Sequence, residues 1–301
     1  MKNTAASISA ASLRPPERQV YHHASGAASR APGAPGALAS SALSRVESAL
    51  LLAVAIALLV ACFGPAVAQH AHYHAFADQR AGWGVPFAMD VLSNLPFAVA
   101  GVWGLIALRR LPADTPSSAQ SVSQPGAQPA VAALFFAGLL VTAACSSFYH
   151  WQPDNAGLAI DRLGMVVAFA GLLGLAVADR ISGRAGLTTA ATVLALGPLS
   201  VMVWATSGSL LPWAVLQGGG MLLIGLLAVC KATRTPIAGA WGIPLPAVIA
   251  LYALAKVLEL ADHEVFELTH HLVSGHSLKH AVAALAAWPL IRVMQNHATL
   301  R

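Results

Sequence analysis

The chain has 301 residues, of which 57% are hydrophobic and only 10% are charged. A soluble globular domain carries about a quarter charged residues, so this composition excludes a water-exposed globule and indicates a membrane domain with polar ends. The net charge is +5, but no basic helix or aromatic-interleaved patch accompanies it, which argues against a nucleic-acid partner. The three cysteines lack CxxC spacing and predict neither a disulfide framework nor a redox motif.

The N-terminal part of the chain divides into a polar segment and an apolar one. Residues 1–48 are rich in Ala, Ser, Gly and Pro without apolar periodicity, which predicts a disordered cytoplasmic tail. The uncharged run Ala49–Ala68 is long enough to span a bilayer. Its end, Ala66-Val67-Ala68, is also typical of a signal-peptidase site, so residues 49–69 are either an extra N-terminal transmembrane helix or a cleaved signal segment.

Seven further apolar segments between residues 78 and 295 are long enough to cross a bilayer. They are Val91–Leu108, Val131–Tyr149, Leu158–Ala178, two helices between Arg184 and Lys231, Ile243–Leu260 and Gly275–Val293. The stretch before Lys231 holds two helices because Ser207-Gly208-Ser209 and Pro212 indicate a turn. The sequence therefore predicts an all-α polytopic membrane protein with seven core spans, one extra N-terminal hydrophobic helix, and a short C-terminal tail at residues 296–301.

The charges of the loops predict the orientation in the membrane. With the N-terminal tail in the cytoplasm, the basic ends of the spans all fall on the cytoplasmic side, while the opposite loops carry mostly Asp, Glu and His. This alternation obeys the positive-inside rule and predicts that both termini are cytoplasmic. The composition resembles that of a bacterial protein, so the expected location is the bacterial inner membrane.

The predicted topology brings four ionisable residues to one membrane face. His150 ends a span on the outer side, Asp161 begins the next span, and His276 and His280 lie at the start of the last one. His276 and His280 are four residues apart, so both imidazoles share a helical face, which suits two ligands of one Zn²⁺ with His150 as the third. Zinc brings the pKa of bound water to about 7. Asp161 is then placed to take a proton from that water, and Ser146, one turn before His150, to hydrogen-bond the oxyanion.

Each of these residues also has a purely structural interpretation. A single histidine near a helix end is often just an interfacial polar residue, and a small residue such as Ser146 often serves close helix packing. Ionisable groups inside spans are costly and usually functional, however, and here four of them converge. We therefore predict a metal site or active site near the outer face.

The same residues carry a resemblance to a known family. Ser146-x3-His150, then Asp161, then His276-x3-His280 in the last helix resembles the alkaline ceramidases. These belong to the CREST superfamily of seven-helix membrane hydrolases, which includes the adiponectin-receptor type. The resemblance implies zinc held by the three histidines, a proton-handling role for Asp161 and an oxyanion role for Ser146. The implied substrate is ceramide or a similar N-acyl lipid.

The sequence departs from the alkaline ceramidase pattern at one place, and two other functions remain as alternatives to an amidase. Eukaryotic alkaline ceramidases have an acidic N-terminal calcium site, but the corresponding stretch, Asp78–Trp83, has one carboxylate and an arginine, so that site is not carried over. A receptor or sensor with structural zinc would need a fourth protein ligand. A b-type haem carrier would need histidines on facing helices, which a same-face pair fits poorly. Nothing in the pattern specifies an oligomeric state.

Overall fold

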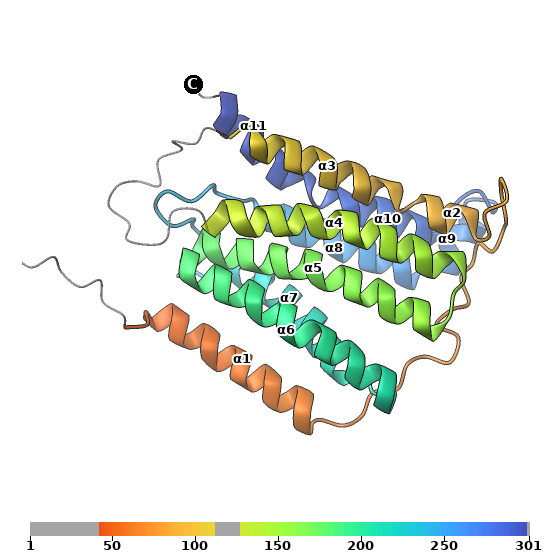
Figure 1. The fold of residues 1–301 in the computed structure, drawn as a ribbon, viewed down its shortest axis with the longest axis horizontal. Coiled ribbons are helices and arrows are strands. Elements are labelled where there is room, and N and C mark those ends of the chain that lie inside the picture. Colours follow the sequence, from red (N-terminus) through yellow and green to blue (C-terminus); the bar gives the residue numbers. More distant parts are fainter. Residues whose placement is uncertain (1–41, 112–126, 300–301) are drawn as a thin grey trace, which may run out of the picture. The chain divides into compact units, whose positions relative to one another are not determined.

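The computed structural model describes residues 42–111 and 127–299, and within these ranges it contains eleven helices and no strand (Figure 1). The helices are α1 (Arg45–Phe63), α2 (Ala88–Leu92), α3 (Leu95–Arg109), α4 (Ala127–Trp151), α5 (Asn155–Arg180), α6 (Gly183–Ser207), α7 (Leu211–Val229), α8 (Leu245–Leu260), α9 (Asp262–Leu268), α10 (Gly275–Leu285) and α11 (Trp288–Thr299). The predicted tail at residues 1–41 lies outside the described residues.

Six helical segments are long and apolar enough to cross a membrane. They are α1, the combined segment Ala88–Arg109 that holds α2 and α3, α4, α5, α6 and α7. Each has 19 to 26 residues, and about 20 helical residues cross the hydrocarbon core of a bilayer. The prediction of an all-helical integral membrane protein is confirmed at this level.

The first helix begins earlier than the sequence pattern indicated. The side chain of Ser44 accepts a hydrogen bond from the backbone N–H of Glu47, and the Glu47 carboxylate accepts one from the N–H of Ser44. This reciprocal capping starts α1 at Arg45, so residues 45–48 of the predicted tail are helical. The helix ends at Phe63 rather than Ala68, because Gly64-Pro65 follows and proline cannot continue a helix.

The last predicted span, Gly275–Val293, is divided into α10 and α11. Pro289 has no N–H to donate to the carbonyl group of Leu285, and its ring would clash with that carbonyl group. The break between the two helices follows from this proline. The C-terminal helix then continues to Thr299, into the predicted tail at 296–301.

Helices α4 and α5 form the centre of the bundle, where α4 also contacts α3 and α5 also contacts α6 (Figure 1). A Cβ atom at Gly138 would lie 2.3 Å from the backbone nitrogen of Ala168. A Cβ atom at Gly171 would lie 2.2 Å from the backbone nitrogen of Phe135. Only glycine allows two helix backbones to approach this closely, so these two positions set the α4–α5 spacing.

The two ends of the bundle differ in chemistry. We call the end where α5 finishes the basic end, because it gathers Arg45, Arg109, Arg180, Arg184, Lys231 and Arg234. There the buried side chain of Arg180 donates to the carbonyl groups of Arg234 and Ile243. Arg184 pairs with Glu47 at 2.9 Å, which ties the start of α6 to the start of α1. We call the opposite end, where α4 finishes and α10 begins, the histidine end.

Candidate metal centre

Three buried histidines converge at the histidine end. His150 lies at the end of α4, and His276 and His280 lie in the first two turns of α10. The ring centroids are 4.8 Å apart for His150–His276, 5.0 Å for His150–His280 and 4.8 Å for His276–His280. One nitrogen from each ring lies within 4.8 Å of the others. Within the described residues this is the cluster of histidine, cysteine and carboxylate side chains that can hold a metal ion.

Local capping places the two histidines of α10. The side chain of Ser274 accepts a hydrogen bond of 3.0 Å from the backbone N–H of Ser277, which starts the helix at Gly275. The carboxylate of Asp262 in α9 accepts a second one, of 2.7 Å, from the backbone N–H of His276. These contacts satisfy N–H groups that lack partners inside the helix. They fix the register that turns His276 and His280 toward His150.

A serine at the α2–α3 junction orients the deepest histidine. The Ser93 Oγ lies 3.0 Å from the carbonyl oxygen of Asp90 and 2.8 Å from Nδ1 of His280. A hydroxyl has one proton to donate, so when it donates to Asp90 it accepts from Nδ1–H of His280. That tautomer leaves the Nε2 lone pair of His280 for a metal ion. In metal sites a ligating histidine usually donates its other N–H to such an outer partner.

The two other predicted site residues are Ser146, one turn before His150 on α4, and Asp161 on α5. Ser146 is buried and Asp161 is half-buried, and the two side chains are near each other. The Oδ1 atom of Asp161 is buried and has no hydrogen-bond partner in the described part of the chain. A buried carboxylate oxygen of this kind is costly unless it has a ligand or water to bind. This oxygen is therefore the part of Asp161 available for chemistry.

The structure adds a lysine that the sequence analysis did not single out. The ammonium group of Lys279 lies 3.0 Å from Nε2 of His276 and 3.2 Å from the carboxylate of Glu259 on α8. Glu259 also pairs with Lys256, one turn before it. The charge of Asp161, the predicted proton acceptor, also acts on Lys279. The place of Lys279 beside His280 in the sequence gave no signal of this, since the contacts depend on how α8 packs against α10.

The segment between α1 and α2, residues 64–87, covers the cluster from one side, and we call it the cover segment. Its Phe76 is buried, with the ring centroid 4.8 Å from that of His150 and 4.5 Å from that of His276. His74 contacts the hydroxyl group of Tyr149 at 2.8 Å. The backbone N–H of Ala77 donates to Asp262 at 2.9 Å. These contacts hold an aromatic ring directly on the two histidines.

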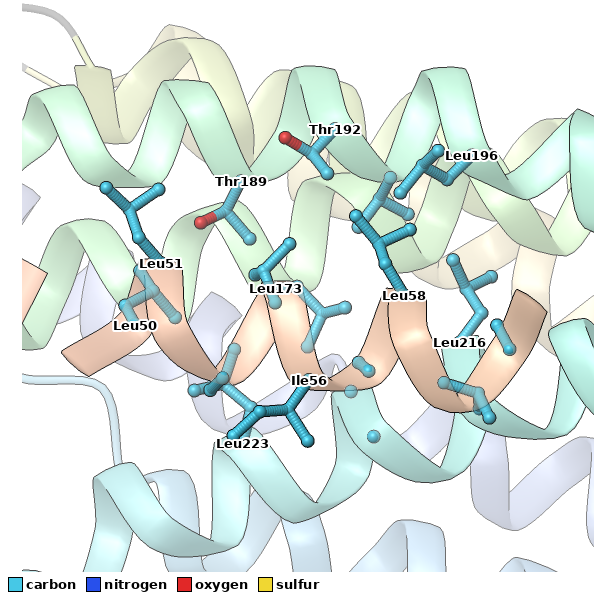
Figure 2. Close-up of a pocket in the computed structure, with 18 of the residues that line it drawn as sticks. Leu50, Leu51, Ile56, Leu58, Leu173, Thr189, Thr192, Leu196, Leu216 and Leu223 are labelled. Carbon is cyan, nitrogen blue, oxygen red and sulfur yellow. The ribbon is translucent and has the colours of Figure 1, made fainter. Parts of the chain in front are cut away.

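The large apolar groove of the bundle is separate from the histidine cluster. It lies between α1, α6 and α7, has a volume of about 910 Å³, and none of the three histidines lines it. Figure 2 shows Leu58 of α1, Leu196 of α6 and Leu216 of α7 around it, with Thr189 and Thr192 of α6 among the polar members. The groove therefore does not form part of the candidate metal centre.

Comparisons with known proteins give no match. No family model, no curated protein and no solved structure matches this chain.

Proposed function

We propose that the chain is a zinc-dependent intramembrane amidase, which hydrolyses the N-acyl amide bond of ceramide or a related lipid to a fatty acid and an amine. The observation that carries this proposal is the triangle of buried imidazoles formed by His150, His276 and His280. Its members come from two helices far apart in the chain. No packing requirement explains three buried imidazoles whose nitrogens face one another.

The donor set and its spacing fit zinc. Two imidazole nitrogens on one tetrahedral zinc ion lie about 3.3 Å apart, given zinc–nitrogen bonds of about 2.0–2.1 Å. The Nε2 atoms of His150 and His276 are 3.2 Å apart. Three imidazoles with no anionic ligand are a donor set that zinc accepts in catalytic sites. Calcium and magnesium prefer oxygen ligands, so these ions fit the cluster poorly.

The number of protein ligands favours an enzyme over a receptor with structural zinc. A structural zinc site has four protein ligands, whereas a catalytic site has three and an open position. Within the described residues the cluster has three members. A haem carrier is disfavoured because ring centroids 4.8–5.0 Å apart leave no room for a macrocycle between the imidazoles.

In the proposed reaction, zinc would polarise the amide carbonyl group and make water acidic enough to react at neutral pH. Asp161 takes one proton from the attacking water through its unpartnered Oδ1 atom. Ser146 donates a hydrogen bond to the carbonyl oxygen as negative charge develops there. The oxygen of water bonds to the carbonyl carbon, the C–N bond breaks, and Asp161 returns the proton to the departing nitrogen. The products are a carboxylic acid and a free amine.

The helix order supports a seven-span core preceded by one extra helix. After α1, the bundle has α2 with α3, then α4, α5, α6, α7, α8, and finally α10 with α11. With α8 and the α10–α11 pair counted as spans in addition to the six long segments, this order would give the seven-helix core implied by the resemblance to the alkaline ceramidases and the CREST superfamily. Because basic residues favour the cytoplasmic side, we propose that the basic end faces the cytoplasm of a bacterial cell and the histidine end faces outward.

The test is a zinc and activity measurement on purified protein. We expect about one zinc ion per chain and release of fatty acid from ceramide. The His276→Ala variant should lose both. His263→Ala is the matched control, because His263 is exposed on α9 outside the cluster. Full activity in zinc-free wild-type protein would overturn the proposal.

A further inference from the structure

The wall of the histidine cluster carries a network of charged side chains. Glu259 on α8 pairs with Lys256 through Oε2 and lies 3.2 Å from the ammonium group of Lys279 on α10 through Oε1. One carboxylate thus serves two ammonium groups. Within the set of ion pairs formed by Lys256, Glu259 and Lys279, two ammonium groups therefore face one carboxylate.

Lys279 also competes with a metal ion for one nitrogen atom. Its ammonium group lies 3.0 Å from Nε2 of His276, and this nitrogen is 3.2 Å from Nε2 of His150. An imidazole nitrogen has a single lone pair, so it cannot accept a hydrogen bond from lysine while it binds a cation. When His276 binds a metal ion, Lys279 therefore loses this acceptor.

The side chain of Lys279 would nevertheless stay in place, because its ion pair with Glu259 does not depend on His276. Lysine has three N–H donors, and the side chain of Lys279 is only 18% exposed, so a donor released from His276 has little water to turn to. Buried donors in proteins are satisfied by an acceptor. An acceptor brought by the substrate fits this place, directly beside the reacting amide.

We propose that Lys279 binds an anionic group on the amine portion of the substrate, so that the preferred substrates are N-acyl amino acids or similar amides with a carboxylate close to the scissile bond. The inference rests on the proposed amidase function and makes anionic amides the preferred substrates over neutral ones such as ceramide. The carboxylate belongs to the amine portion, because the acyl portion is apolar and lies within the bilayer. The ammonium group of Lys279 selects an anion over a neutral hydroxyl group, because a hydrogen bond between two charged groups is stronger than one to a neutral acceptor.

The experiment compares two substrates with the same acyl chain and amide bond. N-oleoylglycine carries a carboxylate on the amine portion, and N-oleoylethanolamine carries a hydroxyl group there. With zinc-loaded protein in detergent, we expect kcat/KM to be at least about tenfold higher for the glycine conjugate, the size expected for a charge-assisted hydrogen bond. Most of the difference should lie in KM.

Variants of Lys279 separate specificity from catalysis. In Lys279→Gln the two amides should have about the same kcat/KM, so that the preference for the glycine conjugate is lost. Lys279→Arg should retain most of that preference. Lys231→Gln is the matched control, because Lys231 is exposed at the basic end and its loss should leave the preference unchanged. Binding is measured separately from turnover on the Asp161→Asn variant, where the glycine conjugate should bind more tightly than the ethanolamine conjugate.

Three results would overturn the inference. If wild-type protein hydrolyses both amides equally well, the substrate class is wrong while the amidase function stands. If Lys279→Gln slows both amides by the same factor, Lys279 acts on the shared carbonyl group instead. If neither amide nor ceramide is hydrolysed and no zinc is bound, the amidase function fails and this inference fails with it.

Discussion

The hydroxyl group of Ser93, between α2 and α3, lies 2.8 Å from Nδ1 of His280 on α10. This contact holds the ring orientation of a candidate metal ligand from a distant part of the chain. Partners of this kind typically change metal affinity by about 10–100-fold when they are removed. We expect Ser93→Ala to weaken zinc binding by about that factor, measured by competition with a chromophoric chelator.

The control for Ser93 is Ser147→Ala. The Ser147 hydroxyl group is also partly buried, but it donates to the carbonyl oxygen of Val91 and touches no histidine. Its removal should leave zinc affinity unchanged. Equal losses of affinity in the two variants would mean that Ser93 acts through general packing and not through His280.

Asp161 should matter for turnover and not for metal binding. Asp161→Asn removes the proton acceptor but keeps the shape of the side chain, and loss of a general base costs about 10²–10⁴-fold in rate. We expect that loss in kcat with the zinc content unchanged. Asp154→Asn is the control on the same helix, since Asp154 caps α5 and asparagine caps helices equally well. Loss of zinc in Asp161→Asn would instead make Asp161 a ligand.

The ion pair in the cover segment should make stability depend on pH. The Asp78 carboxylate accepts from Arg80 Nε at 2.8 Å and from Nη2 at 2.6 Å. Burial alone raises the pKa of Asp78, but these hydrogen bonds outweigh it and hold the pKa below its usual value of 3.8. A carboxyl group whose folded-state pKa is lowered contributes stability above its unfolded pKa, and that contribution disappears as the pH falls through the folded value.

Thermal unfolding of Asp78→Asn and wild type measures this contribution. We expect the variant to have the lower Tm at pH 7, and the difference to shrink as the pH falls below about 4. Glu264→Gln, at an exposed position on α9, should show no such trend. A Tm difference that stays constant from pH 7 to pH 3 would exclude the ionised carboxylate as its source.

The close approach of α4 and α5 can be tested with one methyl group. Gly171→Ala places a Cβ atom 2.2 Å from the backbone nitrogen of Phe135, and overpacking of this kind costs about 1–3 kcal/mol. We expect a lower Tm in detergent. Gly218→Ala on α7 is the control, because no atom lies within 4 Å of its added Cβ and alanine favours a helix over glycine. Equal Tm values for the two variants would show that α4 and α5 can separate at little cost.

The parts of the site that could be predicted from sequence are those set by local periodicity. His276 and His280 share a face because of their spacing, and the alternation of loop charges placed His150 at the same end of the bundle. The role of Lys279 could not be predicted, because it depends on the packing of α10 against α8. Phe76 is a similar case, since no periodicity marks a loop residue that folds back onto two helices.

The fold can likewise be divided into features that the sequence pattern predicts and features that it does not. Hydrophobic run length identified the six long spans, because apolar length is the requirement that a bilayer imposes. The run length could not show that Gly275–Val293 is two helices, although Pro289 marks the break. The start of α1 at Arg45 depends on the reciprocal bonds of Ser44 and Glu47, which hydrophobicity does not report.

The ring of Phe76 lies on His150 and His276, and this has a consequence for how the candidate metal centre would gain and lose an ion. On that side, an ion or chelator reaches the imidazoles only after the cover segment detaches from Tyr149 and Asp262. Along this route, the rate of metal exchange would be limited by the opening of the cover segment and not by the strength of the nitrogen–metal bonds alone. A protein that holds its ion for hours against excess chelator need not bind it with unusual affinity.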